Sequence, residues 1–294
     1  MVALRPDGSV ARAVGVVDQP VFPRSANKPL QAVGLLGCGW QPADDEQLAL
    51  ATASHSGEPR HLEVLGRLLG DLSEADLGCP PQLPLGEQAA HAVLAAGGGP
   101  GRRLMNCSGK HAAMLATCRT RGWPLAGYLS ADGPLQTALT VAVERLAGEP
   151  VRHVAVDGCG APQHALTLLG LARAYGRLVL APAGSDERRT ADAMRRHPEL
   201  VGGTGRDVTL LMLGVPGLLA KDGAEGVYAA ALPDGSAVAL KIQDGAARAR
   251  VPVLVAALRA LGAAGDVLDE LATLPVLGAG RQVGEVRVAG DLAG

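Results

Sequence analysis

The sequence Arg24-Ser25-Ala26-Asn27-Lys28-Pro29-Leu30-Gln31 places a hydroxyl and an amine three residues apart, at a point where a helix is expected to begin. One helical turn brings positions i and i+3 onto the same face, so the Lys28 amine is expected to lie beside the Ser25 oxygen. A serine hydroxyl is a poor nucleophile, and a neutral lysine is one of the few side chains that can take its proton. Because Ser-x-x-Lys is short and common by chance, its meaning depends on the rest of the chain.

The segments on either side of this motif predict strands at both chain ends and helices between them. Residues 1–10 resemble two strands joined by a Pro-Asp-Gly turn, residues 10–21 a strand, and residues 226–242 two strands joined by a Pro-Asp-Gly-Ser turn. Helical spacing of apolar residues predicts helices over 28–36, 59–69, 110–118, 135–146, 161–174, 186–196 and 248–261.

This order of segments predicts an α/β fold in which both chain ends join one antiparallel sheet. We expect one domain over residues 1–294, with a sheet lobe at about 1–24 and 207–294 and a helical lobe at about 25–206. A cleft between two such lobes is a natural place for a small-molecule site.

Composition excludes several classes of function. A net charge of −2 and 2% aromatic residues argue against binding to nucleic acid or to an anionic membrane. The sequence contains no apolar run long enough to span a bilayer, and its first residues do not resemble a signal peptide. Five cysteines are an odd number, which favours reduced thiols, so we expect a cytoplasmic protein.

A second polar cluster, Ala53-Ser54-His55-Ser56-Gly57-Glu58, precedes a predicted helix. Hydroxyls followed by a glutamate are typical of a helix cap, which would explain the cluster without any chemistry. The functional alternative is that Ser54 passes a proton, or directs an attack, into the site that contains Ser25. The sequence leaves both interpretations open.

Three further motifs carry chemically useful side chains: Asn106-Cys107-Ser108-Gly109-Lys110-His111, Asp157-Gly158-Cys159, and Lys221-Asp222-Gly223. A lysine two residues before a glycine, at the head of a late strand, is what Ser-x-x-Lys enzymes of the β-lactamase and penicillin-binding type use to hold an anionic substrate. From the residues alone, the cysteines are better interpreted as structural thiols than as metal ligands, since lysine is an unusual zinc ligand.

Taken together, the chain resembles the Rhizobium-type L-asparaginases, also called thermolabile or class 3 asparaginases. The resemblance runs in order along nearly the whole chain, through the three motifs above and through Arg24-Ser25-x-x-Lys28-Pro29-x-Gln31, Ser54-His55-Ser56-Gly57-Glu58, His197-Pro198-Glu199, Gly203-Thr204-Gly205-Arg206 and Ala224-Glu225-Gly226. It implies a homodimer with a serine β-lactamase-like fold that hydrolyses L-asparagine to L-aspartate and ammonia without an organic cofactor.

The resemblance also implies two serine–lysine pairs, Ser25 with Lys28 and Ser54 with Lys221. It implies a zinc ion on Cys107, Lys110 and Cys159, with Asp157 close by. We hypothesise that Ser25 is acylated, that Lys28 is its base, and that Ser54 and Lys221 relay the proton. The two serines could exchange these roles. A second lysine nearby favours a neutral Lys28, because like charges and burial both disfavour protonation.

Six further residues are candidates either for holding the substrate or for ordinary capping and structural roles: Arg24, His55, Asn106, His111, Thr204 and Arg206. Two departures from the family pattern accompany them. Asp222 adds a carboxylate that can pair with a neighbouring amine and raise its pKa. Family members also have a further strand before the position of Met1, so we expect an uncovered sheet edge there.

Two other functions remain open at this point. One is a Ser-x-x-Lys hydrolase of another substrate class, such as a β-lactam or a peptide amide, which a nitrocefin assay beside an asparagine assay would distinguish. The other is a non-catalytic homologue that binds an amino acid. It would be stabilised against heat by asparagine without releasing ammonia.

Overall fold

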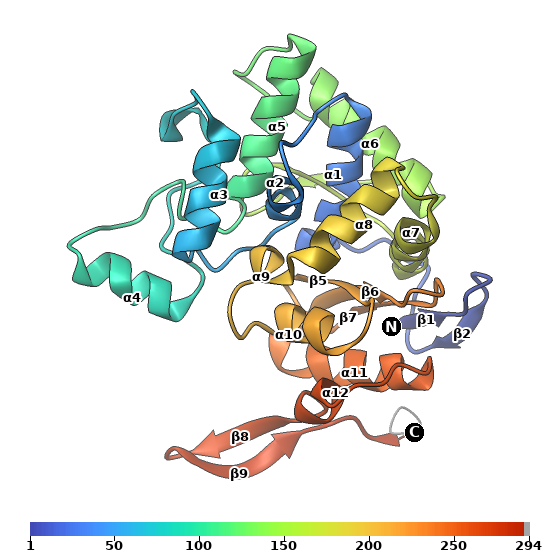
Figure 1. The fold of residues 1–294 in the computed structure, drawn as a ribbon. Coiled ribbons are helices and arrows are strands. Elements are labelled where there is room, and N and C mark those ends of the chain that lie inside the picture. Colours follow the sequence, from blue (N-terminus) through green and yellow to red (C-terminus); the bar gives the residue numbers. More distant parts are fainter. Residues whose placement is uncertain (291–294) are drawn as a thin grey trace.

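The chain folds as an α/β protein in the computed structural model, which describes residues 1–290 (Figure 1). Its helices are α1 (Lys28–Gly37), α2 (Asp45–Ala51), α3 (Pro59–Leu69), α4 (Glu87–Ala95), α5 (Ser108–Arg121), α6 (Pro134–Ala147), α7 (Leu168–Leu180), α8 (Asp186–Arg196), α9 (Pro198–Val201), α10 (Asp207–Gly214), α11 (Arg250–Ala260) and α12 (Val267–Glu270). Its strands are β1 (Val2–Leu4), β2 (Val10–Ala13), β3 (Val154–Val156), β4 (Pro162–His164), β5 (Leu219–Gly223), β6 (Val227–Ala231), β7 (Ala237–Lys241), β8 (Leu274–Gly278) and β9 (Arg281–Val286).

Both ends of the chain contribute to one five-stranded antiparallel sheet, as the turn signals predict. The strand order is β2-β1-β7-β6-β5, and the N-terminal strand β1 joins the C-terminal strands by pairing with β7. Strand β1 is therefore hydrogen-bonded on both sides, and the uncovered edge expected at the N-terminus is formed by β2 instead. Every residue of β6 is buried, which places this strand in the core of the protein.

Helices cover the sheet on its two faces (Figure 1). Helix α7 packs against β1, β6 and β7, while α11 packs against β6 and β7 from the side where the C-terminal segment lies. Above α7, helices α1, α2, α5, α6 and α8 pack on one another and form the helical part of the molecule. Small and aliphatic side chains dominate this core, in keeping with the low aromatic content.

The predicted helices at 59–69 and 186–196 are confirmed as α3 and α8, whereas two other predicted elements are wrong in extent. Helix α7 begins at Leu168 and not at 161, because Thr167 caps it by accepting a bond from Gly170 N, and residues 162–164 form β4. The strand expected over 10–21 ends at Ala13, since Gly15 has a φ of 72° that turns the chain away.

Two parts of the chain extend from the body of the protein (Figure 1). Strands β8 and β9 form a two-stranded hairpin, and α4 is a nine-residue helix with no buried residue. Neither was predicted from the sequence. Within residues 1–290, no helix has both the length and the apolar character needed to cross a membrane.

Candidate active site

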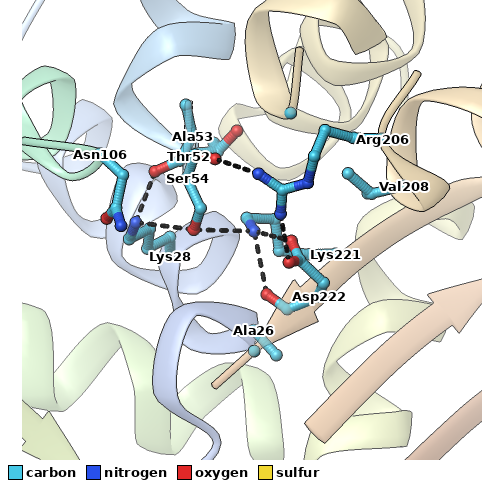
Figure 2. A network of polar contacts seen from close by, with 12 residues as sticks. Ala26, Lys28, Thr52, Ala53, Ser54, Asn106, Arg206, Val208, Lys221 and Asp222 are labelled. Carbon is cyan, nitrogen blue, oxygen red and sulfur yellow. Dashed lines mark hydrogen bonds and ion pairs between the residues drawn. The ribbon is translucent and has the colours of Figure 1, made fainter. Parts of the chain in front are cut away.

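Two lysines from distant segments meet at the hydroxyl of Ser54 (Figure 2). The Lys28 amine donates to Ser54 Oγ at 3.1 Å, and the Lys221 amine donates to the same oxygen at 3.0 Å. Lys28 is the first residue of α1, Ser54 follows α2, and Lys221 lies in the middle of β5. The fold therefore assembles this group at the junction of the helices and the sheet.

Ser54 is held in place by the backbone on both sides of it. Ser54 N donates to Val201 O at 3.0 Å, and His55 N donates to Asn106 O at 3.1 Å. Two residues further on, Ser56 N donates to Gly202 O at 2.8 Å. These bonds fix an extended segment between α9 and the start of α5, so the hydroxyl has little freedom to move away from the lysines.

A short 3₁₀ helix, Arg24–Asn27, carries Ser25 and lies directly against β5. Tyr175 of α7 anchors it by donating to Ala26 O at 2.8 Å. A side chain at Gly223 would place its Cβ 2.6 Å from Pro23 O, so only glycine allows β5 to approach this closely. Gly223 therefore allows the strand that carries Lys221 to lie close to the segment that carries Ser25.

The Ser-x-x-Lys motif suggests that Ser25 bonds to Lys28, but the structure does not show this bond. Within residues 1–290 its hydroxyl makes no hydrogen bond, and the Lys28 amine donates instead to Ser54 and, at 2.5 Å, to Ala53 O. The Ser25 side chain nevertheless lines the same cavity as Ser54. The two hydroxyls thus share one cavity, with the two amines gathered at the Ser54 oxygen.

The preceding residue, Arg24, has a φ of 52°, a left-handed conformation that costs a non-glycine residue about 1–3 kcal/mol. Its guanidinium lies 2.7 Å from Asp157 and 2.8 Å from Glu225. These ion pairs tie the Ser25 turn to two other loops and hold its strained backbone in place.

Asp222 binds three cations around the site. Its Oδ1 lies 2.5 Å from the Lys221 amine, and its Oδ2 lies 2.8 Å from Arg206 and 3.6 Å from Arg250 (Figure 2). These neighbours hold the pKa of the buried Asp222 carboxyl below its usual range, against the effect of burial. The carboxylate that the sequence marks as a departure is therefore the counter-ion of the site.

Burial lowers the pKa of Lys221 to about 8, with Asp222 opposing this shift and the nearby Lys28 adding to it. Both lysines are almost completely inaccessible to solvent. Two ammonium groups that share one hydroxyl oxygen would repel each other in this buried site. The site therefore favours a state in which one of the two amines is neutral.

A cavity of about 370 Å³ opens beside these groups. Nine residues line it: Ser25, Ser54, Leu85, Asn106, Arg206, Asp222, Gly223, Ala224 and Arg250. A larger cavity of about 810 Å³ lies between α11 and the β1–β2 hairpin, but none of the predicted site residues lines it. The smaller cavity is therefore the candidate active site.

Of the six predicted substrate-holding residues, Asn106 and Arg206 line this cavity. Thr204 bonds to Glu58 through both N and Oγ1, at 2.8 and 3.0 Å, and does not line the cavity. Arg24 is engaged by its two carboxylates.

The two predicted histidines are completely buried beneath the site. His55 accepts from Gly57 N at 3.2 Å through Nδ1, so its Nε2 carries the proton toward Ser108 Oγ at 2.8 Å. Burial keeps the pKa of His55 well below its usual value. His111 Nδ1 contacts the Tyr128 hydroxyl at 2.6 Å. These contacts give both rings a role in supporting the loops around the cavity.

The three residues expected to bind zinc come together next to the site. Lys110 donates to Cys159 Sγ at 3.2 Å, and the Cys107 thiol donates to Asn106 Oδ1 at 2.9 Å. The neighbouring Cys107 thiol and Lys110 amine lower the pKa of Cys159. No three His, Cys, Asp or Glu side chains converge as a metal site within residues 1–290. Thiolates are common zinc ligands, whereas a lysine amine is an unusual one.

Two residues of the cavity were not assigned a role from the sequence, namely Arg250 and Leu85. Arg250 begins α11, which the sequence predicts only as a helix. Leu85 lies in the segment before α4, where the sequence carries no signal for a site. No motif links either residue to the serines or lysines, so only the fold could reveal them.

A cavity lined by two serine hydroxyls, one of them bound by two buried lysines, is the kind of site in which an enzyme binds a small molecule. A family model described as L-asparaginase II matches residues 1–288. The chain belongs to the L-asparaginase II family and is an asparaginase, which confirms the activity predicted from its motifs. A search of curated proteins found no match.

Proposed function

We propose that this asparaginase hydrolyses L-asparagine to L-aspartate and ammonia by serine–lysine catalysis, on a fold of the serine β-lactamase type. The observation that carries this proposal is the convergence of Lys28 and Lys221 on Ser54 Oγ, in a cavity that Ser25 also lines. Nothing in the cavity favours a β-lactam or a peptide amide as the substrate.

In the proposed mechanism, Ser25 attacks the side-chain amide carbon of the substrate. Its Oγ faces the cavity without a hydrogen bond to residues 1–290, so its lone pairs are open to substrate. The Ser54 oxygen instead lies between two amines, 3.1 Å from Lys28 and 3.0 Å from Lys221. Ser54 is therefore better placed to pass a proton than to attack.

Lys28 is the proposed base, because its hydrogen-bond partners are a carbonyl and a hydroxyl, both uncharged. Lys221 has the carboxylate of Asp222 as a counter-ion and is the amine that keeps its charge. When substrate is bound, the Ser25 hydroxyl must turn toward Ser54, and the Ser54 hydroxyl must donate to the Lys28 amine. The Ser25 proton then passes to Ser54 while the Ser54 proton passes to Lys28. The proton then returns to the leaving ammonia, and water hydrolyses the β-aspartyl ester on Ser25.

The test is release of ammonia and aspartate from L-asparagine by the purified protein, measured with and without a chelator. We expect turnover of L-asparagine and no hydrolysis of nitrocefin. Nitrocefin hydrolysis without aspartate formation would reject the proposal. Heat stabilisation by asparagine without any aspartate formation would also reject it, in favour of a binding protein.

The charge of Lys221 predicts the pH dependence of this activity. Its pKa is about 8, so kcat/KM for L-asparagine should fall above about pH 8 as Lys221 loses its proton. Asp222 raises that pKa, so Asp222→Asn should move the decline to lower pH. Profiles from pH 6 to 10 test this, with Asp234→Asn, in the β6–β7 turn, as the control. A rise in activity through pH 8 would instead make neutral Lys221 the base.

Zinc on Cys107, Lys110 and Cys159 is a proposal that rests on the composition of this buried group, with Asp157 nearby and bonded to Arg24. When bound, zinc would supply a Lewis-acid centre for positioning the substrate. We expect Cys107→Ala to lose zinc that the parent and Cys118→Ala retain, as measured by elemental analysis. Zinc affinity should decrease as the pH is lowered, because the ligands must lose their protons to bind the metal. Equal zinc in all three proteins would remove the site.

Two further expectations remain proposals. All five cysteines are free, which supports a cytoplasmic location. The homodimer rests on the resemblance alone, and light scattering of the purified protein tests it.

A further inference from the structure

Three of the nine residues that line the catalytic cavity carry charge, and two of these are arginines. Both arginines, Arg206 and Arg250, reach Asp222, which is also bound by Lys221, and Arg250 reaches a second carboxylate, Asp207, which does not line the cavity. The lining of the cavity is therefore more positive than negative. A substrate with a carboxylate of its own would balance this charge on binding, whereas a neutral amide would not.

Arg250 is fixed in place by neighbours on several sides. Its NH2 lies 3.0 Å from Asp207 and 3.6 Å from Asp222, and its NH1 donates to Gly223 O at 3.0 Å. The guanidinium lies over the Tyr228 ring, 5.5 Å from the ring centroid. A guanidinium held in this way loses little conformational entropy when it binds a ligand.

The two guanidinium groups also adjoin each other. Arg206 reaches the same Asp222 oxygen at 2.8 Å, so the arginines lie side by side at the wall of the cavity. A guanidinium has five N–H donors, and the bonds described here leave donors on both residues. Paired arginines with free donors match the geometry of a carboxylate.

We infer that Arg250, together with Arg206, binds the α-carboxylate of the substrate and thereby selects amides that carry a free carboxylate. This inference rests on the proposed function, because it assigns the end of the substrate that Ser25 does not attack. Arg24, the other arginine near Ser25, does not line the cavity and is engaged by Asp157 and Glu225.

Two fragments of asparagine test the inference. Succinamate keeps the carboxylate and lacks the α-amine, whereas β-alaninamide keeps the amine and lacks the carboxylate. Each is used as a competitor while aspartate formation from L-asparagine is measured, in the parent, in Arg250→Lys and in Arg259→Lys. Arg259 is the matched control, because it lies on the same helix and is paired with Asp269 at the surface.

We expect Arg250→Lys to raise the inhibition constant of succinamate roughly 10- to 100-fold, the loss typical of a hydrogen bond to a charged group. The constant for β-alaninamide should change less than twofold, and Arg259→Lys should change neither. A merely structural role for Arg250 would weaken both competitors equally, and this result, or no change in either, would overturn the inference.

If Arg250→Lys forms no aspartate, the affinity for L-aspartate is measured by calorimetry instead. An affinity at least tenfold weaker than that of the parent supports the inference, and an unchanged affinity rejects it. Failure of the parent itself to form aspartate is a different result, since it rejects the proposed function.

Discussion

Replacing Ser25 with alanine is expected to reduce kcat for L-asparagine by about 10⁴-fold or more, the loss typical of removing a catalytic nucleophile. The protein should remain folded, because the Ser25 hydroxyl makes no hydrogen bond within residues 1–290. Its Tm should therefore stay close to that of the parent. Aspartate formation and thermal unfolding of the same preparation measure the two effects separately.

Ser54→Ala is the informative comparison, because it removes the oxygen on which both lysines converge. The expected loss is about 10²- to 10⁴-fold, the range of proton-transfer catalysis. Mass spectrometry after rapid acid quenching should find a β-aspartyl adduct on Ser25 in the parent. An adduct on Ser54, or full activity in Ser25→Ala, would exchange the roles of the two serines. Ser236→Ala, in the β6–β7 turn, should behave as the parent does.

The sheet was predictable from the sequence because its turns have strong local signals. The Pro-Asp-Gly turn at residues 6–8 and the Pro-Asp-Gly-Ser turn at 233–236 mark hairpins that the structure contains. The β8–β9 hairpin was not predicted, because its residues are largely exposed and therefore lack the alternation of buried and exposed residues that marks a strand. Residues 162–164, Pro-Gln-His, carry no strand signal of their own, and their pairing with β3 is a tertiary contact that helical spacing cannot predict.

The sequence motifs predicted which residues belong to the candidate site, but they did not predict which of those residues are in contact. The motifs name Ser25, Lys28, Ser54 and Lys221, and the fold brings their segments to one cavity. Spacing along a helix suggested that Lys28 would bond to Ser25, yet its amine reaches across to the segment after α2. The hydrogen-bond partners of a long side chain such as Lys28 depend on tertiary packing and not on spacing along one helix. For the same reason the place of Arg250, from α11, in the cavity wall had no signal in the sequence.

Replacing Lys28 with methionine is expected to reduce kcat by about 10³- to 10⁴-fold, because it removes the proposed base while nearly preserving the volume of the side chain. Lys28 is 1% exposed, and its loss leaves Ala53 O without its donor. An unsatisfied buried carbonyl costs about 1–3 kcal/mol of stability, so Tm should also fall. Lys241→Met is the matched control, since within residues 1–290 Lys241 bonds only to the backbone carbonyls of Glu225 and Ile242.

Lys28→Arg separates the two ways in which Lys28 could act. Arginine can still donate to Ala53 O and keep a positive charge near Ser54, but it does not lose its proton in proteins. If Lys28 is the base, Lys28→Arg should be about as inactive as Lys28→Met at every pH, while its Tm lies closer to that of the parent. If Lys28 acts only through its charge, Lys28→Arg should recover most of the activity, and the base would then have to be Lys221. Because Lys221 is paired with Asp222, that second result should also make Asp222→Asn more active than the parent at neutral pH, which is the opposite of what we expect.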